Sequence, residues 1–343
     1  IFYVKELFVA WQQFDRGSAY QIGCRIGGKS MNESIRLRFG KELIKQAAEN
    51  NFLIFNADTK SCGIEKFGEM YPERNFTFGI AEQNLMAAAA GAALSGEKVF
   101  LATFAVFASM RACEQVRTFI CYPKLDVTIL ASHGGLQTGA DGASHIAVED
   151  ISILRSIPNI TIVEPSDYIA GELLVKKAID FHGPLYIRFP KEATPCIHDK
   201  SYNMTIGKAN IIKDGHDVTL IASGWILSKA IEAADILKSK GIDAAVIEMH
   251  TIKPLDNEAV LNTAKRTGAI VTIEDNTILG GLGSAVMESL SDTYPIPVIR
   301  IGILDQFGES GIPDLLYKKN KMSVDNIVDA AYRAIDLKEN RLK

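Results

Sequence analysis

The chain lacks the features of several large classes of protein. Its five cysteines are odd in number and form no CxxC pair, so neither a disulfide framework nor a zinc site is expected, and a reducing, cytoplasmic compartment is favoured. No apolar run is long enough to span a membrane. The formal net charge is −4, and lysine and arginine form no basic stripe, so nothing indicates nucleic-acid binding. What remains is a globular chain of 343 residues, 47% of them hydrophobic, which is long enough for two domains.

The first thirty residues differ from the rest of the chain. They read IFYVKELFVAWQQFDRGSAYQIGCRIGGKS, with no initial methionine and without the order of regions of a signal peptide. Met31 is the first methionine, and the helical pattern MNESIRLRFGKELIKQAAEN begins there at once. We expect 1–30 to be a leader of vector or upstream origin, or a poorly ordered arm. The alternative is a native arm that binds a partner.

Two series of alternating strands and helices follow the leader. In the first series, β-branched runs predict strands at 52–58, 99–104, 126–132, 160–167 and 184–190. The stretch KEATPCIHDKSYNMTIGKA (191–209) interrupts the rhythm, and a second series begins at VTLIASG (218–224). Nearly continuous apolar strands between helices are typical of parallel sheets covered by helices. The sequence therefore predicts two consecutive α/β domains, 31–195 and 207–343, each with a mostly parallel sheet flanked by helices.

Polar and aromatic side chains follow the predicted strands of the first domain. In open parallel sheets, ligands bind beyond the carboxyl ends of the strands. These ends offer Asp58, Phe104, Phe107, His133, Asp167, Arg188 and Lys191. The loop SHGGLQTGADGASH (132–145) is the richest, because it carries His133, Asp141 and His145 among glycines that let a backbone approach a ligand closely. Two histidines on one such loop could converge on a small polar molecule.

A glutamate stands at an unexpected position in FGIAEQN (78–84). Glu82 lies between a glycine turn and the apolar run LMAAAAGAAL. An unpaired carboxylate that enters a dry interior is costly. Glu82 therefore either caps a helix or faces a ligand that needs it.

Each of these residues also has a purely structural explanation. Glu82 could interact with a helix dipole, and Phe104 and Phe107 could belong to the core. Asp58 could be a turn residue and Arg188 a surface charge. The glycine-rich loop could be a metal site, although no carboxylate or thiolate with ligand spacing lies nearby.

From about residue 31 to the end, the order and spacing of the segments resemble the pyrimidine-binding and C-terminal domains of transketolase. The matching segments are NAD (56–58), FGIAEQN, ATFAVF, SHGGLQTGADGASH, SIPNITIVEPSD, YIRFPKE, MHTIKPLD, IEDN…GGLGSAV and IGILDQFGESG. GIAEQN and GADGASH at this separation are specific, whereas a short match such as GGLG is not.

The resemblance implies a transferase that uses thiamine diphosphate to move a two-carbon ketol unit between phosphorylated sugars. It implies that Glu82 bonds N1′ of the aminopyrimidine and that Phe104 and Phe107 pack on this ring. Asp58 matches an acid near the cofactor and the subunit contact. Met110 stands where the family often has a third aromatic residue, which is a departure in the cofactor pocket.

The resemblance also implies how the sugar is bound. His133 and His145 match histidines that contact sugar hydroxyls and stabilise the intermediate, and Asp141 matches an aspartate that reads a hydroxyl. Arg36 and Arg188 match arginines that hold a sugar phosphate, a task suited to the guanidinium fork. The nearby Arg38 could take the place of the first of these arginines.

One departure changes the expected assembly. Transketolase binds the diphosphate and its Mg²⁺ through a GDG…N signature, and no GDG occurs here. The chain thus resembles the C-terminal half of a split transketolase. We expect an N-terminal-half partner subunit that provides most of the ligands of the Mg²⁺ ion. We also expect a heterotetramer in which two copies of this chain form a dimer.

Three alternatives remain open. A β subunit of a 2-oxo-acid dehydrogenase shares the glutamate and the architecture, but the loop with His133, Asp141 and His145 favours a sugar hydroxyl. A deoxyxylulose-phosphate-synthase-like enzyme shares features of this loop. A non-catalytic scaffold partner would keep the fold, but would have no need of Glu82 and both histidines.

Overall fold

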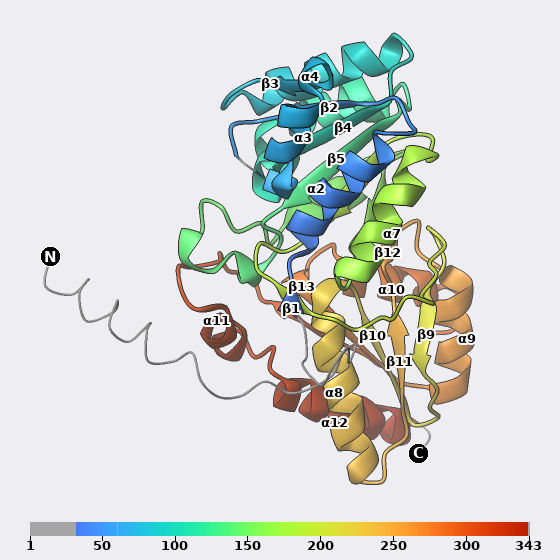
Figure 1. Cartoon of the computed structure of the whole chain (residues 1–343). Helices are drawn as coiled ribbons and strands as arrows, with labels where there is room; N and C mark the ends of the chain where they lie inside the picture. The colour runs from blue at the N-terminus through green and yellow to red at the C-terminus, as the bar shows by residue number, and fades with distance from the viewer. Residues whose placement is uncertain (1–31, 60, 342–343) are drawn as a thin grey trace, which may run out of the picture.

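The computed structural model describes residues 32–59 and 61–341 (Figure 1). The expected leader, 1–30, lies outside the described residues. Two sheets, one of seven strands and one of five, follow one another along the chain, and helices cover both. The predicted fold class, two consecutive α/β domains with mostly parallel sheets, is confirmed.

The first domain is built on the seven-stranded sheet, in the order β12-β6-β7-β5-β4-β2-β3. Its strands are β2 (Leu53–Asn56), β3 (Asn75–Thr77), β4 (Val99–Phe104), β5 (Val127–Ser132), β6 (Thr161–Val163), β7 (Leu185–Arg188) and β12 (Thr251–Lys253). Only the pairing of β12 with β6 is antiparallel. The central strands β5 and β7 are buried along their whole length, as expected for a parallel sheet covered on both faces.

Helices from several parts of the first domain cover its two faces. On one face, α2 (Ile35–Gln46) and α7 (Tyr168–Ile179) bury an apolar cluster with the sheet. The other face is covered by α4 (Glu82–Leu94) and by a helical segment of two π-helices, η3 (Phe107–Arg111) and η4 (Val116–Cys121), that flank α5 (Cys113–Gln115). The remaining short elements are β1 (Asn32–Glu33), η1 (Ser61–Gly63), α3 (Glu65–Met70), η2 (Pro72–Arg74), η5 (Leu136–Asp141), α6 (Asp150–Arg155) and β8 (Thr194–Pro195).

The second domain is built on the five-stranded sheet, in the order β14-β13-β10-β11-β9. Its strands are β9 (Asn210–Lys213), β10 (Val218–Ala222), β11 (Ala244–Glu248), β13 (Ile270–Thr277) and β14 (Val298–Ile303), and only β9 is antiparallel to its neighbour. Its helices are α8 (Leu227–Ser239), α9 (Asn257–Thr267), α10 (Leu282–Ser291), α11 (Pro313–Lys319) and α12 (Val324–Arg341), with the short η6 (Gly224–Ile226). Residues at both ends of α9 explain where this helix begins and ends. The side chain of Asp256 caps the first turn, and Gly268, with a φ of 68°, ends the helix.

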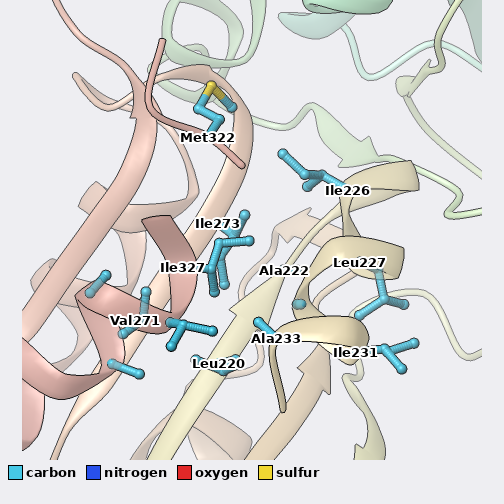
Figure 2. Packing of buried hydrophobic residues seen from close by; sticks show 14 of the residues in the cluster. Leu220, Ala222, Ile226, Leu227, Ile231, Ala233, Val271, Ile273, Met322 and Ile327 are labelled. Carbon is cyan, nitrogen blue, oxygen red and sulfur yellow. The ribbon is translucent and has the colours of Figure 1, made fainter. Parts of the chain in front are cut away.

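The core of the second domain lies between its sheet and the helices α8 and α12. Figure 2 shows Leu220 and Val271 of the sheet beside Ala233 of α8 and Ile327 of α12, and all four are buried. Such close apolar packing is the main source of stability in a domain of this size.

The two domains are not cleanly separated along the chain. Strand β12 lies within 207–343, the range predicted for the second domain, but it pairs with β6 at the edge of the first sheet. In the other direction, Leu136 and Ile146 of the first domain are buried in the core cluster of the second. Among the helices of residues 32–59 and 61–341, none is both long and apolar enough to cross a membrane.

Candidate functional site

Four rings gather beyond the carboxyl ends of β4 and β5. Phe104 ends β4, and His133 follows Ser132, the register partner of Phe104 on β5. The centroid of the His133 ring lies 3.8 Å from that of Phe104, and the centroids of Phe104 and Phe107 are 5.6 Å apart in a stacked arrangement. His145 reaches the same place from the end of the loop, 5.8 Å from Phe104 and 5.6 Å from Phe107. The structure therefore brings together three residues that the strand ends predicted, Phe104, Phe107 and His133, with His145 of the glycine-rich loop.

Glu82 is the first residue of α4, and its side chain is only 1% exposed. One carboxylate oxygen, Oε2, accepts a hydrogen bond of 2.7 Å from Nη1 of Arg111. The other oxygen, Oε1, is buried and has no hydrogen-bond partner within the part of the chain that the structure describes. An unsatisfied buried acceptor costs about 1–3 kcal/mol, so this oxygen fits a ligand that brings a donor. The N–H of a protonated aminopyrimidine is such a donor.

Arg111 is a site residue that the sequence analysis missed. It ends the π-helix η3, and its guanidinium carbon lies 4.1 Å from the ring centroid of Phe107 while it also binds Glu82. The available signal was its position four residues after Phe107, which places the two on one face of a helix. Turns of π-helix are frequent at functional sites.

The imidazole of His133 is enclosed and uncharged near neutral pH. The pKa of His133 is lowered to about 3, chiefly by burial; Asp141 opposes this shift, and the charges of Lys191 and Arg36 contribute to it. Its Nδ1 lies 2.9 Å from Oγ of Ser132, and its Nε2 lies 3.5 Å from Oδ2 of Asp141. A neutral ring that accepts from Ser132 at Nδ1 carries its proton on Nε2, where it can be donated. The contact with Asp141 is therefore a polar contact and not an ion pair at pH 7.

Asp141 is held by a lysine from another strand end. Nζ of Lys191, three residues beyond β7, donates to both carboxylate oxygens of Asp141, at 2.8 and 2.9 Å. Lys191 was noted as a strand-end residue, but its link to Asp141 depends on how the loop folds back across β5 and β7. The site thus contains an ordered carboxylate next to a neutral imidazole.

The two arginines of α2 have different surroundings. Arg38 donates to Glu172 at 2.8 Å and also to Glu33, so its charge is balanced away from the rings. Arg36 lies near enough to His133 for its charge to lower the pKa of that histidine, whereas Arg38 has no such effect on it. Nε of each arginine is buried with no hydrogen-bond partner among the described residues, so this atom does not distinguish them. Arg36, and not Arg38, is therefore the arginine of α2 that faces the candidate site.

The expectation that Arg188 holds a sugar phosphate is wrong in this structure. Its side chain is 1% exposed, and each of its nitrogens already donates inside the protein. Nε binds Asp150 at 3.0 Å, Nη1 binds Glu164, and Nη2 binds the carbonyl oxygens of Ala147 and Asp275 at 3.0 and 2.8 Å. The buried carboxylates that surround Arg188 come from distant parts of the sequence, and a phosphate has no access to it.

Two other expectations concern the cofactor. Asp58 is exposed just beyond the end of β2, at the same edge of the sheet as the rings. Within residues 32–59 and 61–341, no group of three or more His, Cys, Asp or Glu side chains is placed to hold a metal ion. The described residues therefore fit the aminopyrimidine end of thiamine diphosphate, but offer no carboxylate cluster for the Mg²⁺ of its diphosphate.

Comparison with protein families covers both domains. Residues 34–196 match the family described as the transketolase pyrimidine-binding domain, and residues 207–327 match the transketolase C-terminal domain.

Individual relatives agree with these matches. A putative transketolase C-terminal section from Methanocaldococcus jannaschii is 41% identical over 83% of this chain and 91% of its own length. A 1-deoxy-D-xylulose-5-phosphate synthase from Desulforudis audaxviator is 37% identical over 85% of this chain, but the match spans only 47% of that enzyme. A solved structure described as a split gene transketolase, inactive beta4 tetramer, superposes with a TM-score of 0.83 at 42% identity, covering 89% of this chain and 99% of the other.

Proposed function

Since this chain belongs to the transketolase family, we propose that it is the C-terminal subunit of a split, thiamine-diphosphate-dependent transketolase. The enzyme would be active only with an N-terminal-half partner subunit. It would transfer a two-carbon ketol unit from a ketose phosphate to an aldose phosphate. The observation that carries the proposal is the buried Glu82, whose Oε1 has no hydrogen-bond partner among the described residues. Its other oxygen binds Arg111, whose guanidinium lies over the ring of Phe107, and Phe107 stacks on Phe104.

On the cofactor side, Glu82, Phe104 and Phe107 would hold the aminopyrimidine. The phenyl rings would offer flat apolar contact to the aminopyrimidine, and Oε1 of Glu82, which has no partner among the described residues, would accept a hydrogen bond from the N–H at N1′. Thiamine diphosphate, when bound, would supply the nucleophilic carbon and the electron sink that cleavage of the C2–C3 bond of a ketose requires. The task of Glu82 is to hold and exchange the proton at N1′, and Arg111 keeps its carboxylate in place.

On the substrate side, the loop would bind the sugar. His133 donates the proton on Nε2 to a sugar oxygen, because its ring is neutral and its Nδ1 faces Ser132. His145 contacts a second oxygen at the mouth of the site, and Asp141, oriented by Lys191, accepts from a sugar hydroxyl. Arg36 would bind the substrate phosphate with its fork of donors.

The partner subunit would supply what this chain lacks. The diphosphate and its Mg²⁺ would be bound mainly by the N-terminal-half subunit, with Asp58 near the contact between the chains. Two copies of this chain would pair about a two-fold axis, as isologous interfaces favour, within a heterotetramer. The related structure described as an inactive beta4 tetramer supports both self-association and the need for a partner. The free cysteines Cys113 and Cys121 are compatible with the reducing cytoplasm.

Reconstitution tests the proposal. The chain, mixed with an N-terminal-half subunit, thiamine diphosphate and Mg²⁺, should convert xylulose 5-phosphate and an aldose phosphate acceptor, whereas neither subunit should do so alone. The relation to 1-deoxy-D-xylulose-5-phosphate synthases favours one second candidate, the condensation of pyruvate with glyceraldehyde 3-phosphate. Turnover of pyruvate without ketol transfer would replace the proposal with a synthase or a 2-oxo-acid dehydrogenase. No turnover with any of these substrates would favour a scaffold.

A further inference from the structure

A carboxylate of the second domain holds the loop that carries the candidate sugar-binding residues. Asp275 lies in β13 and is 1% exposed. Its Oδ1 accepts a hydrogen bond of 3.0 Å from the backbone N–H of Leu136, the first residue of η5. Its Oδ2 accepts from Nε1 of Trp225 at 3.1 Å and from the hydroxyl of Tyr317. Asp275 is thus fixed from within its own domain and presents one oxygen to the loop.

The loop backbone lies directly against this carboxylate. Gly135 has a φ of 76°, and a Cβ at this position would lie 2.1 Å from Oδ2 of Asp275. Only glycine combines this backbone conformation with so close an approach. The contact is therefore built into the sequence of the loop.

Arg188 closes the other side of the same junction. Its Nη2 donates to the carbonyl oxygens of Asp275 and of Ala147, which lies just after the loop. A Cβ on Gly134 would lie 2.8 Å from the Arg188 side chain. The arginine that was expected to bind phosphate instead links Ala147, at the end of the loop, to Asp275 of the second domain and lies against Gly134 at its start.

The second domain also contacts the middle of the loop. Gly311 N donates to the carbonyl oxygen of Gly139 at 3.4 Å, and the loop lies beside α11 in Figure 1. Leu136 and Ile146 are buried in the core of the second domain. Glu82 and Phe107, by contrast, stand on helices packed against the first sheet. The sugar-facing loop, which also contacts the first domain, is therefore held in addition by the second domain.

We propose that Asp275 is a positioning residue that sets the geometry of the sugar-binding loop, residues 133–145, from the second domain. It controls the affinity for the sugar and leaves the affinity for the cofactor unchanged. This inference rests on the proposed function for the identity of the ligand, but the anchoring of the loop is testable without it.

The first test follows the loop in the whole chain without a partner. Asp275→Asn keeps the shape, but an amide has one acceptor oxygen where the carboxylate has two, so either Leu136 or the donors Trp225 and Tyr317 lose their acceptor. Hydrogen–deuterium exchange should become about tenfold faster in peptides that cover 133–146, as the loss of one hydrogen bond predicts. Peptides from β4 should not change. Asp305→Asn, an exposed aspartate of the same domain, is the matched control.

Tyr317→Phe is the milder second variant, in case Asp275→Asn fails to fold. It removes one donor that fixes Asp275 and leaves the bond to Leu136 intact, so the same peptides should exchange faster by a smaller factor. Unchanged exchange of 133–146 in every folded variant overturns the anchoring role.

The second test uses the complex with the partner subunit. Asp275→Asn should raise KM for the sugar by at least about tenfold, because a small displacement of contacting groups is costly, while the concentration of thiamine diphosphate for half-saturation stays at the wild-type value. A parallel loss of sugar and cofactor affinity would mean general destabilisation and would contradict the proposal. If the wild-type complex turns over no sugar, the proposed function fails, and the exchange experiment still decides whether Asp275 anchors the loop.

Discussion

Glu82 and Arg111 form an ion pair of 2.7 Å, in which the side chain of Glu82 is 1% and that of Arg111 43% exposed. The arginine occupies one oxygen of Glu82 and lies over the ring of Phe107. The remaining oxygen is buried without a partner among the described residues. This arrangement holds a carboxylate in a fixed direction with one acceptor unused, which is what a residue needs to bind and exchange a proton on a ligand.

Glu82→Gln tests the proton-exchange role. Glutamine keeps the size and an acceptor oxygen but cannot carry the proton, so kcat of the reconstituted complex should fall by at least about 100-fold, the usual scale for loss of a general acid–base group. Glu69→Gln, which changes an exposed glutamate of the same domain, should leave kcat unchanged. Activity of Glu82→Gln within a few-fold of wild type would show that this carboxylate has another task.

The buried imidazole of His133 predicts how stability depends on pH. Burial lowers the pKa of His133 from 6.5 in the unfolded chain to about 3 in the folded one. Between these values the unfolded chain binds more protons than the folded one. The free energy of unfolding is therefore at its full value above pH 6.5, as far as His133 is concerned, and decreases as the pH falls toward 3.

Urea unfolding between pH 4 and pH 7 checks this prediction. The free energy of unfolding should rise less steeply with pH in His133→Asn than in wild type. His216→Asn, at a histidine that is 75% exposed, should keep the wild-type slope. Equal slopes for His133→Asn and wild type would mean that His133 can take up its proton in the folded chain.

Arg36 is the arginine that we expect to bind phosphate. Arg36→Ala should raise KM for a phosphorylated sugar about 10- to 100-fold, because charge-assisted hydrogen bonds contribute about 1.5–3 kcal/mol. It should change KM for the unphosphorylated sugar much less. Arg38→Ala is the control, since Arg38 already pairs with Glu33 and Glu172. An equal effect of Arg36→Ala on both sugars would show that Arg36 does not contact the phosphate.

Arg188 should be needed for stability. Arg188→Met removes the cation that lies between Asp150 and Glu164, so both carboxylates remain buried without their partner. Breaking a buried ion pair in this way lowers the free energy of unfolding by about 3–5 kcal/mol. Thermal unfolding should show a large drop in Tm, or no folded chain should be recovered. Arg333→Met, on the exposed side of α12, should have the wild-type Tm. A stable Arg188→Met chain with a raised KM only for phosphorylated sugars would restore the phosphate role.

The sequence was most informative where local pattern and strand order decide the structure. The rule that ligands bind at the carboxyl ends of parallel strands placed Phe104 and His133 at one edge of the sheet, where β4 and β5 are neighbours. The glycine-rich loop after β5 added His145 to this group. Their roles in binding and catalysis stay predictions.

Long-range packing could not be predicted in the same way. The surroundings of Arg188 depend on Asp150, Glu164 and Asp275, which are far apart in the chain and meet only after both domains have folded. The salt bridge of Lys191 with Asp141 depends on the path of a glycine-rich loop. Strand β12 joins the first sheet from within the second domain, which no local pattern indicates.

The isolated chain should bind thiamine diphosphate only weakly, because it fits one end of the cofactor. Glu82, Phe104 and Phe107 offer a place for the aminopyrimidine, but the diphosphate and its Mg²⁺ need several oxygen ligands in fixed positions, and the described residues contain no such cluster. Calorimetric titration of cofactor and Mg²⁺ should therefore show no binding at micromolar concentrations for this chain alone. Adding the N-terminal-half subunit should bring saturable binding, and removing Mg²⁺ with a chelator should weaken it. Micromolar or tighter binding by the isolated chain would mean that it contains its own diphosphate site, which contradicts a cofactor site shared between two subunits.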